Sequence, residues 1–148
     1  MLTQQEADAL LEILKNLQST DGSFEFPGHG ERKELALISE DGRHSFIVDV
    51  NRKGYIFPTK RYTYQGRYRK DIILLRLDIE GPAHRNPDGT LISGNHLHIY
   101  REGFGDRIAF ELPPELANTD DMYQTLIDFL VYFKTCNTDE LNMQTVML

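Results

Sequence analysis

The sequence predicts an α+β domain: an antiparallel meander sheet of about six strands, packed by an N-terminal and a C-terminal helix. Three observations predict this class. Apolar residues recur at helical spacing near both ends, alternating apolar and polar residues fill the middle, and short turn sequences separate these segments. Short connections join antiparallel rather than parallel neighbours. With 148 residues, 40% of them hydrophobic, residues 1–148 are expected to form a single domain with its own core.

The N-terminal helix is expected to begin at Thr3, because Thr3 and Glu6 fit a capping box. Asp21-Gly22 is expected to end it. The apolar stripe of this helix consists of Ala7, Leu10, Leu11, Leu14 and Leu17. A stripe of this width must face a core, so the helix is expected to pack on the sheet.

Strands are expected at residues 35–38, 46–50, 55–64, 70–80, 95–101 and 107–112. Asp41-Gly42 is the first hairpin turn, because glycine accepts positive φ without steric cost, and another turn is placed at Gln65-Gly66. Residues 81–94 have the length of a functional loop rather than of a minimal hairpin. Thr119 is expected to cap the C-terminal helix, which runs to about Cys136. One sheet face should carry both helices and leave the other free for a site.

Composition excludes several classes of protein. No apolar run approaches the roughly 20 residues that a membrane-spanning helix needs, so no membrane partner is expected. The first residues lack the basic start and apolar core of a secretion signal. The lone Cys136 excludes an internal disulfide and a cysteine-based zinc site, so a cytoplasmic location is expected.

Charge is unevenly spread along the chain. The formal net charge is −7, yet eight of the 16 basic residues and only one of the 23 acidic residues lie within residues 52–76. Tyrosines are interleaved with them. Arginine binds phosphate bidentately and aromatic rings stack on bases, so this basic segment is a candidate RNA-binding surface. The candidate RNA-binding residues are Lys60, Arg61, Tyr64, Arg67, Arg69 and Lys70. The alternative is the solvated face of an ordinary strand.

Three of the five histidines lie within residues 84–98. Strand alternation places Arg76 and Asp78 on one face of residues 70–80, and His96 and His98 on one face of residues 95–101. If these strands are neighbours, the four side chains lie together. His84 follows the end of the first strand and is expected over the same face.

Three interpretations of this group remain open. In the first, two histidines act as general base and general acid on RNA without a metal, because histidine exchanges protons near neutral pH. Arg76 then stabilises charge on the phosphoryl oxygens and Asp78 orients an imidazole. In the second, His96 and His98 bind zinc or another divalent ion, with His84 or Asp78 as third ligand. In the third, the group makes only structural contacts. The first is preferred, and it needs no cofactor.

The order of these motifs resembles that of the TumE-like toxins of bacterial toxin–antitoxin systems. The matching pieces are Arg76-Leu77-Asp78, Pro82-Ala83-His84 and His96-Leu97-His98, preceded by the basic, tyrosine-rich run from Arg61 to Arg69. The resemblance covers residues 61–100. The motif spacing differs from the family pattern, and the chain from residue 119 onward lies outside the match. The resemblance implies a small RNA-cleaving toxin silenced by an antitoxin partner that covers the basic segment.

The leading hypothesis is therefore a toxin-like RNA-cleaving or RNA-processing protein whose candidate catalytic residues are His84, His96, His98, Arg76 and Asp78. The alternative is a non-enzymatic module of a phage or mobile element that binds a protein or a small ligand through the same face.

Overall fold

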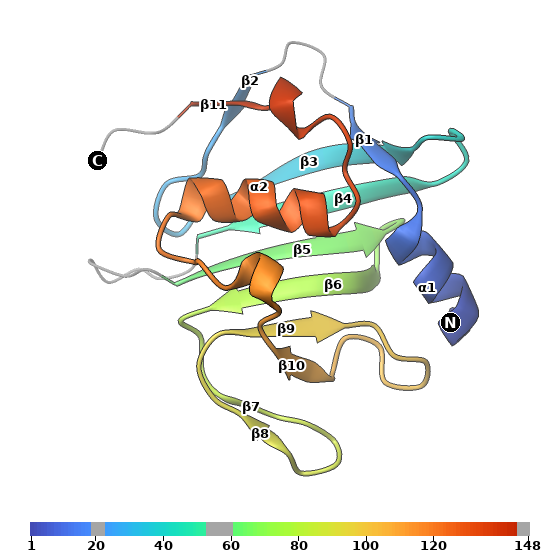
Figure 1. The fold of residues 1–148 in the computed structure, drawn as a ribbon, viewed down its shortest axis with the longest axis vertical. Coiled ribbons are helices and arrows are strands. Elements are labelled where there is room, and N and C mark those ends of the chain that lie inside the picture. Colours follow the sequence, from blue (N-terminus) through green and yellow to red (C-terminus); the bar gives the residue numbers. More distant parts are fainter. Residues whose placement is uncertain (19–22, 53–60, 145–148) are drawn as a thin grey trace.

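The computed structural model describes residues 1–18, 23–52 and 61–144, and Figure 1 shows their arrangement. A seven-stranded sheet has the order β1-β3-β4-β5-β6-β9-β10, with every neighbouring pair antiparallel. Helix α1 (Gln4–Glu12) precedes the sheet and helix α2 (Met122–Tyr132) follows it. The predicted α+β class and terminal helices are thus confirmed, with one strand more than expected.

The strands of this sheet are β1 (Lys15–Leu17), β3 (Arg32–Ser39), β4 (Ser45–Asn51), β5 (Tyr62–Tyr68), β6 (Ile72–Ile79), β9 (His96–Ile99) and β10 (Ala109–Glu111). Two smaller sheets accompany it. Strand β2 (Ser23–Glu25) pairs in parallel with β11 (Asn142–Gln144), and β7 (His84–Arg85) pairs antiparallel with β8 (Leu91–Ile92). The 3₁₀ turns η1 (Pro114–Leu116) and η2 (Thr138–Glu140) flank α2 in the chain.

Helix α1 is shorter than predicted. The capping box of Thr3 and Glu6 is present, but the helix ends at Glu12, and Lys15–Leu17 pairs with β3 as strand β1. The prediction of a helix to residue 21 was therefore wrong for residues 13–18, and residues 19–22 lie outside the described part of the chain. Leu17 is buried. Its burial fits either the next position of a helical stripe or the alternate position of a strand, so the spacing of apolar residues alone could not distinguish helix from strand.

Lys15 holds the two helix ends to β1. Its side chain is buried, and Nζ donates to the carbonyl oxygens of Leu11, Ile13 and Phe133 at 3.2, 3.0 and 2.9 Å. The ammonium also lies 4.2 Å from the centroid of the Phe133 ring. Leu11 lies in the last turn of α1, and Ile13 and Phe133 directly follow α1 and α2, where backbone acceptors have no helical partner. One side chain therefore satisfies the ends of both helices.

Strand β5 and the start of α2 also differ from expectation. The third strand was placed at 55–64 with a turn at Gln65-Gly66 or its surroundings, but β5 continues through Gly66 to Tyr68 and the turn follows at residues 69–71. Residues 53–60 lie outside the described part of the chain. Gly66 pairs with Val48 and Leu75 inside the sheet, and the Phe133 ring lies so close to its backbone that a Cβ has no room there. Asp121, rather than Thr119, caps α2 by accepting from the Tyr123 and Gln124 amides.

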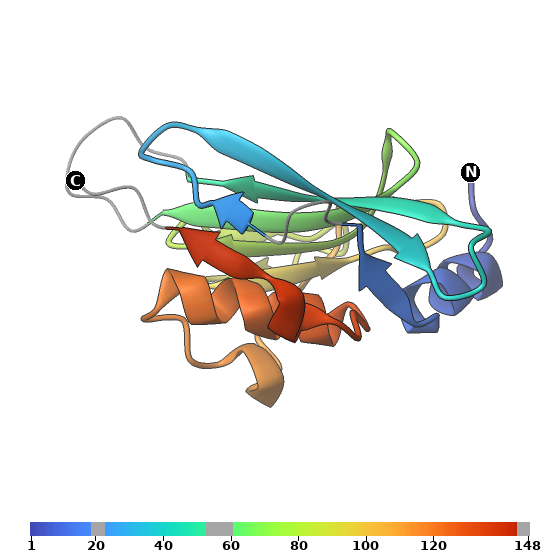
Figure 2. The same ribbon diagram turned by 90° about the horizontal axis from the view of Figure 1, so that it is seen from above.

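The two faces of the sheet differ. Helix α2 lies across one face, as Figure 2 shows from the side, and the Tyr64 hydroxyl on that face donates to the Met122 carbonyl at 2.6 Å. Helix α1 borders the same face, where its Leu11 lies near Leu75 and Ile99 of the sheet. The opposite face carries neither helix, as predicted. None of the described helices is both long and apolar enough to cross a bilayer.

Gly66 gives a test of this packing. In the variant Gly66→Ala the new Cβ would lie 2.7 Å from Cζ of Phe133, closer than carbon atoms approach. We expect the free energy of unfolding in urea to fall by about 1–3 kcal/mol, the usual cost of overpacking a core. Gly81→Ala is the matched control, because its Cβ would make ordinary contacts with Nε and Nη2 of Arg61, at 3.7 and 3.9 Å. Equal stability of the two variants would contradict the close contact.

Lys15 predicts a pH dependence of stability. Burial lowers the pKa of Lys15 from 10.5 to about 7 in the folded chain. Between these values the unfolded chain binds more protons, so the free energy of unfolding should rise as the pH increases from about 7 to about 10. Lys15→Met should remove this part of the slope in urea titrations at several pH values. A variant that keeps the whole wild-type slope would disprove the assignment.

Candidate functional site

Two rows of polar residues cross the open face of the sheet. Each row runs across strands β3, β4, β5, β6 and β9, and the strand register pairs each residue with the next one in its row. The first row is Arg32, Asn51, Thr63, Asp78 and His96. The second row is Glu34, Asp49, Gln65, Arg76 and His98. At about 4.8 Å per strand, each row is about 19 Å long. Alternation produces the rows, because the residues between them face the core.

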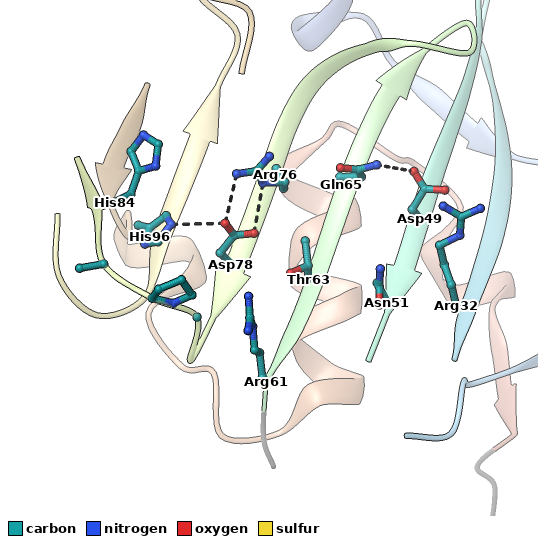
Figure 3. Close-up of a pocket in the computed structure, with 13 residues that line it drawn as sticks. Arg32, Asp49, Asn51, Arg61, Thr63, Gln65, Arg76, Asp78, His84 and His96 are labelled. Carbon is teal, nitrogen blue, oxygen red and sulfur yellow. Dashed lines mark hydrogen bonds and ion pairs between the residues drawn. The ribbon is translucent and has the colours of Figure 1, made fainter. Parts of the chain in front are cut away.

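A polar cavity of about 380 Å³ lies over these rows. Figure 3 shows it from the open face, with Arg32 and Asp49 at one end and His84 and His96 at the other. Residues 81–84 form part of its wall, and Arg61 projects into it from the start of β5. The cavity therefore places three arginines, Arg32, Arg61 and Arg76, around carboxylates and imidazoles.

The three histidines predicted to converge do converge. The ring centroids of His84 and His98 are 4.7 Å apart, those of His96 and His98 are 4.9 Å apart, and those of His84 and His96 are 6.0 Å apart. Strand β6 pairs with β9 so that Arg76 lies opposite His98 and Asp78 opposite His96. We call these five residues the histidine cluster. His84 is half-buried, whereas His96 and His98 are 2% and 1% exposed.

Backbone carbonyls orient the imidazole rings. Nδ1 of His96 lies 3.0 Å from the Gly94 oxygen, and Nδ1 of His98 lies 2.8 Å from the Asp106 oxygen. Carbonyl oxygens only accept, so both Nδ1 atoms carry hydrogen and the Nε2 atoms point into the cluster. Nε2 of His84 lies 2.7 Å from the Arg107 oxygen, which makes it the donor there. Among the described residues, none hydrogen-bonds Nδ1 of His84.

Asp78 is the centre of the cluster. Its Oδ2 lies 3.3 Å from Nε2 of His96 and 3.2 Å from Nε2 of His98, and Nε of Arg76 donates to Oδ1 at 3.2 Å. Burial on its own would raise the pKa of Asp78, but the His98 hydrogen bond and the Arg76 charge outweigh it and lower the pKa to about 2. Asp78 is therefore charged at neutral pH. It does not position the rings through Nδ1, as the backbone does that.

Nε2 of His98 has two competing partners. It lies 2.9 Å from Nη2 of Arg76 and 3.2 Å from Oδ2 of Asp78. Neutral His98 accepts from Arg76, and protonated His98 donates to Asp78, but one nitrogen cannot do both. Asp106 steadies the arginine through an ion pair of 2.6 Å with Nη1. Nε2 of His98 therefore has a hydrogen-bond partner within the cluster in either protonation state.

The candidate RNA-binding residues do not form one surface. Tyr64 is fully buried on the helix-covered face, so its ring cannot stack on a base and its selection is corrected. Arg67 pairs with Asp49 at 2.8 Å and with Glu34 at 2.9 Å. The exposed Arg69 and Lys70 form the turn after β5, at the opposite end of that strand from Arg61. Lys60 lies outside the described residues. Of the five that the structure describes, Arg61 alone lines the cavity.

Sequence reasoning missed several residues of the site. Arg32, Asp49 and Gln65 line the cavity from strands β3, β4 and β5, and Asp106 pairs with Arg76. Alternation in residues 61–67 carries a signal for Gln65, because polar side chains occupy every second position. Asp106 has no local signal, since it reaches the cluster from the turn before β10.

Comparison with known families decides the classification. A family model matches residues 2–135, nearly the whole chain. The chain belongs to DUF6978, a family of unknown function. No curated protein and no solved structure gives a significant match. Membership of DUF6978 assigns no activity, so the link to TumE-like toxins stays a prediction.

The cluster also contains a set of metal-ligand atoms. One ligand atom each from Asp78, His96 and His98 lies within 4.8 Å of the other two. Two imidazoles and a carboxylate are a donor set that zinc accepts. Nη2 of Arg76 lies against two of these donors, 2.9 Å from His98 and 3.3 Å from Asp78. In this conformation a guanidinium therefore takes the place that a cation would need.

The low pKa of Asp78 predicts acid sensitivity. An unfolded aspartate titrates near 3.8, so the unfolded chain binds more protons at low pH. Stability from charged Asp78 is fully present above about pH 4 and is lost as the pH falls towards about 2. Asp78→Asn should lower the free energy of unfolding at pH 7 by about 2 kcal/mol, with a much smaller deficit near pH 2.

Urea denaturation at both pH values measures the difference. Asp71→Asn, at an exposed turn position, is the control and should leave stability unchanged at both. A deficit of Asp78→Asn that is the same at pH 7 and near pH 2 would contradict the charged, paired state of Asp78.

Proposed function

We propose that this protein cleaves single RNA strands by acid–base chemistry at the histidine cluster. The observation that supports it most is the convergence of His84, His96 and His98 on Asp78 and Arg76 beside an arginine-lined cavity. Cleavage of a phosphodiester by the neighbouring 2′-hydroxyl uses a neutral imidazole as general base, a protonated imidazole as general acid and a positive group such as a guanidinium beside the phosphate. The products would be a 2′,3′-cyclic phosphate and a 5′-hydroxyl end.

His84 is the proposed general base. Its Nε2 hydrogen is donated to the Arg107 carbonyl, so a neutral ring presents the lone pair of Nδ1. The ring is half-buried and lines the cavity, where substrate can reach it. Nδ1 would take the proton of the ribose 2′-hydroxyl as that oxygen attacks phosphorus.

His96 is the proposed general acid. Its Nδ1 is held by the Gly94 carbonyl, and its Nε2 lies 3.3 Å from Oδ2 of Asp78, so a proton on Nε2 has an acceptor beside the cavity. Nε2 would give its proton to the 5′-oxygen as the phosphorus–oxygen bond breaks. His98 is a positioning residue, because it is 1% exposed and contacts Arg76, Asp78 and both other rings.

Arginines supply the electrostatic part of the proposal. Arg76 and Arg61 line the cavity and would stabilise the additional charge on the phosphoryl oxygens. With a net charge of −7 the whole chain repels polyanions, so binding depends on these local contacts and weakens with salt. A toxin of this kind needs an inhibitor in the cell that makes it, and an antitoxin-like protein covering the cavity is the proposed partner.

The second candidate is a non-enzymatic module that binds a protein or ligand. The observation that favours it is the burial of His96 and His98, whose exposed fractions are 2% and 1%. A structural polar cluster looks like this when all its groups are paired. The two candidates differ in one measurable respect: only the enzyme requires a titrating nitrogen at His84 and His96.

The two candidate functions can be distinguished with variants that keep the hydrogen bonds to the backbone carbonyls but remove the titrating nitrogens. In His96→Asn the amide NH₂ replaces Nδ1 and can still donate to Gly94, and in His84→Gln it replaces Nε2 and can still donate to Arg107. Each should lower the rate of RNA cleavage by about 100-fold or more, the usual contribution of a general acid or base. His84→Gln should also remove the acidic limb of the pH–rate profile. The thermal midpoint should stay near that of wild type.

A panel of single-stranded RNAs serves as substrate, with a 2′-deoxy nucleotide at the cleaved position as chemical control. His44→Asn is the matched protein control, because His44 contacts Tyr68 outside the cluster. Growth after induced expression provides a second readout. If the wild type cleaves no RNA and arrests no growth, or if both cluster variants keep full activity, the enzyme proposal is wrong and the binding module is supported.

A further inference from the structure

The donor geometry of the histidine cluster points to a zinc site, and we propose that Asp78, His96 and His98 bind one Zn²⁺ ion that displaces Arg76. Binding of the ion would occupy Nε2 of His96, the proposed proton donor, and so inhibit RNA cleavage. The inhibition rests on the proposed function, whereas the binding does not.

The tautomers of both rings suit a metal. The Gly94 and Asp106 carbonyls hold the Nδ1 hydrogens of His96 and His98, so the lone pairs of the neutral rings are at Nε2. This arrangement, with one nitrogen anchored on a carbonyl and the other directed inward, is how proteins orient imidazole ligands. No rotation of either ring is needed to present the donor atoms.

The distances between the donor atoms already approach those of a zinc site. With metal–ligand bonds of about 2.0–2.2 Å and tetrahedral angles, neighbouring donors lie about 3.4 Å apart. Oδ2 of Asp78 lies 3.3 Å from Nε2 of His96 and 3.2 Å from Nε2 of His98. The third edge, between the two imidazoles, is at most 4.8 Å. His96 and Asp78 also line the cavity, from which water can supply the fourth ligand.

Arg76 is the competitor of the ion. Its Nη2 lies 2.9 Å from Nε2 of His98, and its positive charge opposes a cation at the same place. The guanidinium has another partner to retain, because Nη1 pairs with Asp106 at 2.6 Å. Zn²⁺ binding is therefore an exchange in which Arg76 gives up His98 and Asp78 but keeps Asp106. Removal of the guanidinium should favour the ion.

Titration of the tag-free protein with Zn²⁺ tests the proposal. Calorimetry should show one ion per chain, and Co²⁺ in its place should give the visible absorption of a four-coordinate ion. His98→Asn keeps the contact with the Asp106 carbonyl but lacks Nε2, so its affinity should fall about 100-fold or more. Arg76→Met should raise the affinity about tenfold or more, because repulsion and competition both disappear. His44→Asn should bind like wild type.

The outcomes separate the two proposals. Stoichiometric Zn²⁺ binding that depends on His98 and increases in Arg76→Met supports the site, whether or not the protein cleaves RNA. Absence of stoichiometric binding to the wild type, or binding unchanged in His98→Asn, overturns it, even if RNA is cleaved. In a protein that cleaves RNA, Zn²⁺ should inhibit at the concentrations at which it binds, and undiminished cleavage by the loaded protein would overturn the inhibitory role.

Discussion

The attraction between the Asp78 carboxylate and its three basic neighbours is the interaction on which the open face depends. A charged carboxylate removed from water is costly unless it is fully paired, and Asp78 meets this requirement through Arg76, His96 and His98. Each of these neighbours has its own anchor elsewhere, at Asp106 or at a backbone carbonyl. The neighbours are therefore held independently of one another, and Asp78 keeps two of its three partners when one histidine is replaced.

The position of His84 depends on a different set of contacts. Strands β7 and β8 have two residues each, which is too short for independent stability. The β7–β8 hairpin is attached to the segment leading into β10: Asn86 donates to the Ala109 carbonyl and accepts from the Ala109 amide, and His84 meets the Arg107 carbonyl. His84 thus reaches the cluster through these attachments, while His96 and His98 reach it through the sheet itself.

Sequence periodicity predicted the parts of the site that lie on regular strands. Arg76, Asp78, His96 and His98 alternate with buried residues such as Leu77 and Leu97, so their common face followed from the period of a strand. Tyr64 was misplaced for a related reason: its basic neighbours suggested an exposed ring, but alternation puts it on the same face as Gly66, against α2.

Other features depend on contacts between segments far apart in the chain. Residues 14–17 fit a helix and a strand equally well, and the choice is decided by pairing with β3. A glycine at position 66 suggests a turn, yet Gly66 lies in a strand, where the ring of Phe133 leaves no room for a side chain. Arg32 lines the cavity because of the way β3, β4 and β5 pair, and Asp106 contacts Arg76 because of the turn in which it lies. Such contacts leave no local pattern to read.

The contacts of β1 have a consequence for synthesis on the ribosome. Lys15 Nζ needs the Phe133 carbonyl, the Lys15 backbone pairs with Lys134 and Cys136, and the Leu17 amide needs the Asn137 side chain. The strands of the open face are complete at residue 111, before any of these partners has been translated. A nascent chain therefore carries all five members of the histidine cluster while its apolar face still lacks α2. Prematurely terminated chains would expose that face to chaperones and proteases, which makes complete translation a condition for a lasting protein.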